Sequence, residues 1–144
     1  MTNPVRYADD VQVGDTIPPL TTPPITHLQL VRYAGASGDF NPLHTDPLVG
    51  ERIGTGGIIA HGMLIMGLVG QMVSDYVGPQ ALRKFGVRFK GMTHLNDIIT
   101  CTGMITEKFE ADGEQRISGK VQAIDQNGDV KVAGTFVAAL PTRP

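Results

Sequence analysis

A long apolar segment near the middle of the chain, HGMLIMGLVGQMVSDY at residues 61 to 76, constrains the fold more than any other feature. Its apolar side chains lie almost all round a helical projection, which predicts a helix buried on most sides. Gly67 and Gly70 lie inside this helix, and each costs about 1 kcal/mol of helix stability relative to alanine. We therefore expect another part of the chain to approach the helix backbone closely at both glycines. The most apolar window, residues 58 to 73, is short for a bilayer, so no membrane span is expected.

The segments after this helix change to patterns typical of β-strands. Strands are predicted at residues 84 to 90, 98 to 109, 115 to 124 and 129 to 140. Asp112-Gly113 and Asn127-Gly128 suit tight hairpins between them. The economical arrangement is an α+β fold in which one antiparallel sheet curls around the apolar helix. Burying so apolar a helix in 144 residues leaves little to cover the other side of the sheet. We therefore expect the sheet to continue into, or pack against, a second subunit.

The amino-terminal part combines an extended segment with a helix. PPLTTPP at residues 18 to 24 is expected to cross the molecule in an extended conformation, because proline restricts the backbone and lacks an N–H group. Thr26 begins a helix, with the spacing of a capping box to Gln29, and Gly35 and Gly38 are expected to end it. The chain has the length of one domain, so a single domain over residues 1 to 144 is expected.

Composition and missing motifs exclude several classes of protein. Twelve basic and fourteen acidic residues give a net charge of −2, and tryptophan is absent, which argues against a nucleic-acid surface. Cys101 is the only cysteine, so it forms no intrachain disulfide or zinc cluster and is expected to be a small apolar filler. MTNPVRYADD at the start has no signal-peptide pattern, so a cytoplasmic protein is expected. GTGG at residues 54 to 57 has the wrong context for a Rossmann motif, and no P-loop, HExxH or GxSxG motif occurs, so neither a cofactor nor a metal is expected.

A polar, proline-bearing loop, SGDFNPLHTD at residues 37 to 46, holds the first candidate for chemistry. Asp39 and His44 lie on either side of Asn41-Pro42, and the proline stiffens the loop by fixing its own φ and extending the residue before it. Histidine transfers protons near neutral pH, and a neighbouring carboxylate can orient its ring and share a water molecule with it. Alternatively, Asp39 caps a turn, Asn41-Pro42 begins another, and His44 is exposed. The spacing by itself favours this structural alternative.

His61-Gly62, at the start of the apolar helix, is the second candidate. A helix amino terminus presents unpaired N–H groups and the positive end of a dipole. Because Gly62 has no side chain, a ligand oxygen could approach its N–H closely and be polarised there. Alternatively, His61 is a core or capping histidine and Gly62 is a packing residue. Taken alone, this site also favours the structural alternative.

Three basic residues share one face of the first predicted strand after the helix. Lys84, Arg88 and Lys90 share this face with Gly86 and alternate with Phe85, Val87 and Phe89, so they could meet phosphate groups. A solvated sheet face is the simpler interpretation and is slightly favoured.

Two separated stretches resemble the MaoC-like family of (R)-specific enoyl-thioester hydratases and dehydratases. They are YAGASGDFNPLHTDP at residues 33 to 47 and IIAHGMLIMGL at residues 58 to 68, and DFNPLH followed by AHGM at this separation is specific to that family. Val13-Gly14-Asp15 resembles a recurrent entry motif, and the strands fit the hot-dog fold, so the resemblance covers nearly the whole chain. One departure is MTHLND at residues 92 to 97, where the family often has a proline and a glycine. Asn96 tolerates positive φ, so the fold is little affected there.

The resemblance implies a reaction and a set of roles. Asp39 and His44 would be the catalytic pair that holds one water molecule, and the backbone N–H of Gly62 would bond the thioester carbonyl. Asn41 would brace the same loop, and His61, Lys84 and Arg88 are the further candidates for substrate binding or loop support. The reaction would be reversible syn addition of water to a trans-2-enoyl thioester of coenzyme A or acyl carrier protein, giving the (3R)-hydroxyacyl thioester. It needs no metal or redox cofactor.

The resemblance also bears on partners and on competing functions. Related folds pair their sheets, which implies a homodimer or an assembly of dimers, and some relatives form heterodimers with a homologue. Acyl-thioester hydrolysis is an alternative that often uses a carboxylate on the central helix. The only acid there is Asp75, at the far end from Gly62. A non-catalytic binding subunit is a third hypothesis, but such subunits tend to lose the aspartate and histidine that this chain retains.

Overall fold

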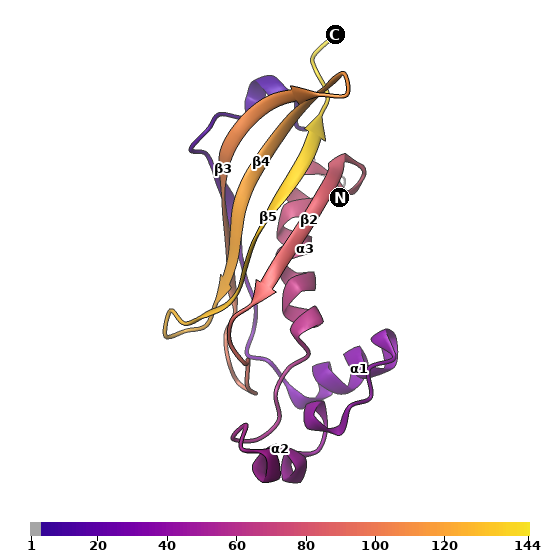
Figure 1. Cartoon of the computed structure of the whole chain (residues 1–144), viewed down its shortest axis with the longest axis vertical. Helices are drawn as coiled ribbons and strands as arrows, with labels where there is room; N and C mark the ends of the chain where they lie inside the picture. Colours follow the sequence, from indigo (N-terminus) through magenta and orange to yellow (C-terminus); the bar gives the residue numbers. More distant parts are fainter. Residues whose placement is uncertain (1–3) are drawn as a thin grey trace.

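A computed structural model describes residues 4 to 144, and it shows one antiparallel sheet curled around a long helix (Figure 1). The first three residues, which belong to the expected single domain and to the segment expected to lack a signal peptide, lie outside the described part. The helix is α3, Gly62–Val77. The sheet has the strand order β1-β3-β4-β5-β2, with β1 Thr16–Thr21, β2 Leu82–Phe89, β3 Thr100–Ala111, β4 Glu114–Ile124 and β5 Val130–Leu140. The predicted α+β arrangement, with the four strands after the helix, is confirmed.

The remaining elements are short and gather mostly near the amino end of α3. They are α1 His27–Ser37, α2 Pro47–Ile53, and the 3₁₀ turns η1 Ala8–Asp10, η2 Pro42–His44 and η3 Pro79–Ala81. Figure 1 shows α1 and α2 beyond the end of the sheet, beside the start of α3. Among residues 4 to 144, no helix combines the length and apolar character needed to cross a membrane.

The hydrophobic core lies between α3 and the concave face of the sheet. Val69 and Val73 of α3 are fully buried against sheet residues that include Cys101 and Phe136. Burial raises the pKa of the Cys101 thiol to about 11, so this cysteine is an apolar core residue as expected. The helix is not buried all round, because the Met63 side chain is 56% exposed and Gly67 lies on the same open side.

The two glycines inside α3 have different surroundings. A Cβ atom at Gly70 would lie 3.3 Å from the ring of Phe85, so β2 does approach the helix closely there. A Cβ atom at Gly67 would meet nothing within 4 Å among the described residues. The expectation of a close approach is therefore met at Gly70 and wrong at Gly67, because Gly67 faces away from the sheet.

The segment expected to cross the molecule forms a strand in its first half. β1 pairs with β3 at one edge of the sheet, and its register shifts between Ile17 and Leu20, where Pro18 and Pro19 lie. A proline cannot donate to the ladder, so such a strand is tolerated only at an edge or at a bulge. Propensity alone missed β1 because the irregular edge position accommodates both prolines.

The first helix begins where the sequence predicts and ends later than one of its two expected glycines. Thr26 caps α1, and its hydroxyl oxygen accepts the N–H of Gln29 at 3.1 Å. Gly35 lies inside the helix, so its expected role as a terminator is wrong. Gly38 ends α1 in the left-handed conformation, with φ of 75°.

The two predicted hairpins differ in their turns. Asp112 and Gly113 both have positive φ, 52° and 74°, as a tight two-residue turn requires. The link from β4 to β5 is longer than the predicted dipeptide turn, and in it only Gly128 has positive φ. The Asp125 carboxylate stabilises this loop by accepting the N–H groups of Asn127 and Asp129 and by pairing with Lys131 at 3.0 Å.

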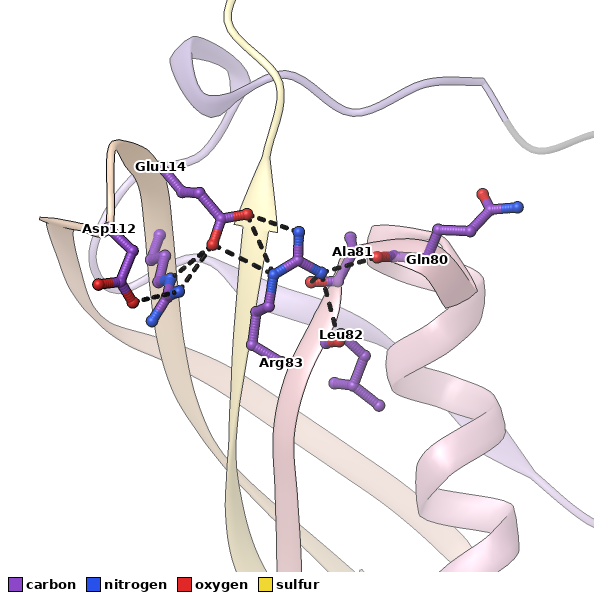
Figure 2. A network of polar contacts seen from close by, with 7 residues as sticks. Gln80, Ala81, Leu82, Arg83, Asp112 and Glu114 are labelled. Atoms are coloured by element: carbon purple, nitrogen blue, oxygen red, sulfur yellow. Dashed lines mark hydrogen bonds and ion pairs between the residues drawn. The ribbon is translucent and has the colours of Figure 1, made fainter.

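An arginine network joins the start of β2 to the start of β4, across β5, and to the turn η3 (Figure 2). Arg83 bonds the Glu114 carboxylate through Nε and through Nη2 at 2.6 Å, and its Nη1 donates to the carbonyl of Gln80 at 2.8 Å. Arg116 bonds the same carboxylate at 2.7 Å. These hydrogen bonds, first from Arg83 and then from Arg116, lower the pKa of Glu114 to about 2.

Candidate active site

Three chain segments bring polar side chains together at the amino end of α3. Asp39 directly follows Gly38, the residue that ends α1, and His44 is the last residue of η2. His61 is the N-cap residue of α3, and Gly62 is the first residue of that helix. Each segment has a local reason for its shape: a left-handed glycine after α1, a proline that opens η2, and a glycine that opens α3.

His44 is held in one tautomer and faces Asp39. Its Nδ1 lies 2.8 Å from the carbonyl oxygen of Ile59, which can only accept, so Nδ1 carries the hydrogen and Nε2 has the free lone pair. This Nε2 lies 3.6 Å from Oδ2 of Asp39, which is longer than a direct hydrogen bond. The His44 side chain is 11% exposed and the Asp39 side chain 52% exposed. The pair is therefore open to solvent on the carboxylate side and anchored on the imidazole side.

His61 contacts both members of this pair. Its ring stacks on the ring of His44, with centroids 3.8 Å apart and planes 24° apart. Its Nε2 lies 3.1 Å from the main-chain carbonyl oxygen of Asp39. His61 is 1% exposed. The ring of Tyr33 also packs against the His61 ring in an edge-to-face contact, with centroids 4.8 Å apart.

Asn41 holds the loop between Asp39 and His44. Its main-chain N–H donates to Oδ1 of Asp39 at 3.2 Å, and its side-chain oxygen accepts the N–H of Leu43 at 3.2 Å. Its carbonyl accepts the N–H of His44 at 3.0 Å. Asn41 therefore links the carboxylate and the imidazole through the backbone, while Oδ2 of Asp39 is left for other partners.

Gly62 is exposed beside this cluster, and its N–H donates to no acceptor within residues 4 to 144. A Cβ atom at this position would lie 3.0 Å from Cδ1 and Cε1 of Phe89. The glycine therefore lets the aromatic ring at the end of β2 pack against the first turn of α3. The amide lies at the positive end of the helix dipole, next in the chain to His61.

The same cluster could be considered as a metal site. Asp39, His44 and His61 each present one ligand atom, and these atoms lie within 4.8 Å of one another. A ring nitrogen binds a metal along a lone pair in the ring plane, at about 2.0–2.1 Å. Because the two rings stack, their lone pairs lie in two nearly parallel planes and do not converge on one ion. The geometry favours acid–base chemistry over a shared metal ion.

Lys84 and Arg88 lie apart from the cluster, on the face of the sheet that points away from α3. With Lys90 and Lys120 they line a cleft of about 770 Å³ whose floor includes Gly86, Ala133 and Thr135. No acidic residue lines this cleft within the described part of the chain. The structure thus gathers the four basic residues, but on the opposite side of β2 from Phe89 and Gly62.

Several residues around the cluster were not predicted from the sequence. Phe89 shares one face of its strand with Phe85 and Val87, in alternation with the basic residues, and this period-two pattern could have indicated its contact with the helix. The carbonyl of Ile59 and the ring of Tyr33 carry no local signal, because their positions depend on how the loops pack.

Comparison with known proteins agrees with this architecture. The family model for the MaoC like domain matches residues 11 to 127. The 3-hydroxyacyl-thioester dehydratase X of Mycobacterium tuberculosis is 38% identical over 72 residues, which are 50% of this chain and 25% of that protein. The matched stretch is thus a quarter of the length of that relative.

Solved structures show the same fold over most of the chain. The R-hydratase PhaJ1 from Pseudomonas aeruginosa superposes with a TM-score of 0.83 at 24% identity, covering 95% of this chain and 86% of that one. A chain of the ChsH1-ChsH2 complex from Mycobacterium tuberculosis gives a TM-score of 0.77 at 26% identity, covering 90% and 98%. The sheet wrapped around α3 is a hot-dog fold, and the chain belongs to the MaoC-like dehydratase domain family.

Proposed function

We propose that this chain catalyses the (R)-specific hydration of trans-2-enoyl thioesters to (3R)-hydroxyacyl thioesters, or the reverse dehydration. The observation that carries the proposal is the separation of 3.6 Å between Nε2 of His44 and Oδ2 of Asp39, with Nδ1 of His44 anchored on the carbonyl of Ile59. Family membership and the likeness to an R-hydratase support it.

The pair can hold and activate one water molecule. Nε2 of His44 and Oδ2 of Asp39 are both acceptors, so a water between them can donate one O–H to each. As the water oxygen bonds to C3 of the enoyl group, one of the two acceptors takes a proton from the water and passes it to C2, so that the water supplies both the hydroxyl group on C3 and the hydrogen on C2. The C2–C3 double bond becomes single, and the same two groups serve the reverse reaction.

The backbone N–H of Gly62 would stabilise the enolate that forms on the thioester oxygen. It is a free donor at a helix amino terminus, where negative charge is favoured. Asn41 would keep the loop rigid while Asp39 and His44 exchange protons. The chemistry asks for no metal or redox cofactor, and the thioester carrier would be coenzyme A or acyl carrier protein.

We also propose that residues 1 to 144 form a single domain. A second copy of this domain would extend the sheet by pairing with the free edge of β2. β1 is interrupted by Pro18 and Pro19, whereas β2 runs for eight residues without proline and, among residues 4 to 144, pairs with β5 alone. An unpaired strand edge of this length is a template for another strand. A heterodimer with a homologue is the alternative, and the ChsH1-ChsH2 complex is a neighbour that contains two different chains.

The direct test is to incubate the purified protein with a panel of trans-2-enoyl-CoAs and follow the loss of enoyl absorbance. Determination of the configuration at C3 is the second part. We expect the (3R) product; formation of the (3S) product would contradict the proposal. Release of free thiol would instead indicate thioester hydrolysis, although Asp75, the acid on α3, is exposed at the far end of the helix from Gly62.

A further inference from the structure

We infer that His61 is a positioning residue that sets the distance between Asp39 and His44, through one hydrogen bond and one ring contact. The inference rests on the proposed hydration reaction, in which that distance defines the water site. His61 does not face the substrate in this assignment; it acts through the two catalytic groups. It is more than 90% buried, as a residue with this role must be to remain in place.

The hydrogen bonds determine which nitrogen of His61 carries the hydrogen. Nε2 lies 3.1 Å from the carbonyl oxygen of Asp39, which can only accept. Nδ1 is buried and has no hydrogen-bond partner among the described residues. An unpaired buried N–H costs more than an unpaired lone pair, so Nε2 carries the hydrogen and donates to Asp39.

This hydrogen bond ties the main chain of Asp39 to α3. The other hydrogen bonds of Asp39 are local, from its N–H to Oγ of Ser37 at 3.1 Å and from Asn41 to its Oδ1 at 3.2 Å. Local bonds shape the loop but do not fix it relative to the helix. His61, as the N-cap residue of α3, supplies that link.

The ring contact fixes the second catalytic group against the same residue. His44 is anchored at Nδ1 by the carbonyl of Ile59, which still leaves its ring free to tilt about that bond. The stacked ring of His61, 3.8 Å away and tilted by 24°, limits this motion. One buried imidazole therefore restrains both catalytic residues, the main chain of Asp39 by a hydrogen bond and the ring of His44 by stacking. A shift of about 1 Å in such a site can lower the rate by about 100-fold.

Three substitutions separate the hydrogen bond from the ring. In His61→Gln the amide nitrogen stands at nearly the same distance from the backbone as Nε2, so the bond to Asp39 can be kept. His61→Asn carries the same amide one methylene shorter and cannot reach. His61→Phe keeps a ring to stack on His44 but has no donor. Steady-state kcat and KM with a trans-2-enoyl-CoA are measured for each, together with Tm and far-UV circular dichroism.

We expect kcat to fall about 10- to 100-fold in His61→Asn and His61→Phe with KM within about threefold of the wild type, and His61→Gln to recover most of kcat. This split, in folded proteins with similar Tm, supports a positioning role. Equal kcat for the Gln and Asn variants, or wild-type kcat in His61→Phe, would overturn it. If a variant does not fold, the imidazole ¹⁵N and ¹³C resonances of the wild type provide the second test, because a hydrogen on Nδ1 of His61 contradicts the assignment. A wild-type protein without hydratase activity would instead refute the proposed function.

Discussion

At the scale of single residues, the candidate site depends on hydrogen bonds that decide which atoms remain free. Oδ1 of Asp39 accepts the N–H of Asn41, whereas Oδ2 points to His44 at 3.6 Å. The two oxygens of one carboxylate therefore have separate tasks, one in holding the loop and one in facing the imidazole. The two nitrogens of His44 also have separate roles, because Nδ1 donates to the carbonyl of Ile59 and Nε2 faces Asp39.

Asp39→Asn tests this division. Asparagine keeps an oxygen that can accept from Asn41, but the amide nitrogen in the place of Oδ2 cannot accept a proton. We expect kcat to fall about 10²- to 10⁴-fold with little change in Tm. Asp46→Asn is a matched control, because the Asp46 carboxylate likewise accepts the main-chain N–H two residues on, that of Leu48. Near-normal turnover in a folded Asp39→Asn protein would end the assignment.

Gly62→Pro and Gly62→Ala together isolate the backbone N–H. Proline is well tolerated at the first position of a helix, and His61 has the extended conformation, φ −58° and ψ 129°, that precedes proline. Both substitutions place a Cβ atom against the ring of Phe89, but only proline removes the N–H. We expect kcat of the proline variant to be about 10²- to 10³-fold below that of the alanine variant. Equal kcat in the two variants would exclude this amide as the oxyanion donor.

At the scale of elements, glycine and arginine contacts decide how β2 lies against its neighbours. Gly70 and Gly62 let Phe85 and Phe89 pack onto α3, so β2 follows the helix toward the candidate site. At the other end, Arg83 joins β2 to the Glu114 carboxylate and to the carbonyls that end η3 (Figure 2). The strand next to the site is thus positioned by packing at one end and by charge at the other.

Glu114→Gln tests the contribution of the arginine network at the start of β2 to stability. The folded-state pKa of Glu114 is lowered from 4.5 to about 2, so its stabilising contribution is present above pH 4.5 and is lost as the pH falls from there toward 2. We expect Tm of the wild type to fall more steeply than Tm of the variant over this pH range. Thermal unfolding across the range measures it, with Glu51→Gln, an exposed glutamate outside the network, as the control. Parallel profiles for wild type and Glu114→Gln would contradict the role of the network.

At the scale of the whole molecule, the two faces of the sheet differ in packing and charge, and its two edges differ in how well they can pair with another strand. The concave face holds the core, and the opposite face carries Lys84, Arg88, Lys90 and Lys120 around a cleft without acids in the described part of the chain. Two such basic faces would repel each other, so stacking of two copies through them is disfavoured. The open edge of β2 is the better surface for a second copy.

Size-exclusion chromatography with light scattering tests the assembly. We expect the chain expressed alone to have about twice its 15.4 kDa mass, because β2 offers a long unpaired edge. An active homodimer would remove the need for a different partner. A monomer that gains activity only with a homologous chain would favour the heterodimer.

The double variant Lys84→Glu, Arg88→Glu tests whether the basic cleft receives the carrier's phosphates. Reversing two charges should raise KM for an enoyl-CoA about tenfold or more, with an effect that weakens as salt is added. The matched control is the enoyl-pantetheine, which lacks the nucleotide and should show the same KM in both proteins. Equal increases of KM for both substrates would indicate a structural effect, and no increase would leave the cleft as a solvated face.

Local sequence patterns by themselves determined the long helix, the four strands that follow it, the cap at Thr26 and the turn at Asp112-Gly113. These features depend on neighbours in the chain, because periodicity and turn geometry are set within a few residues. The motif around Asp39, His44 and Gly62 also indicates the family without reference to the fold.

Only the tertiary structure decided which groups meet. The stack of His61 on His44, the anchoring carbonyl of Ile59, and the side of the sheet that carries Lys84 all depend on the paths of loops between distant segments. The same holds for Gly70, which is in close contact with β2, and Gly67, which is not, although both are glycines in one helix. Packing of the whole chain sets these distances, so they cannot be predicted from local sequence patterns.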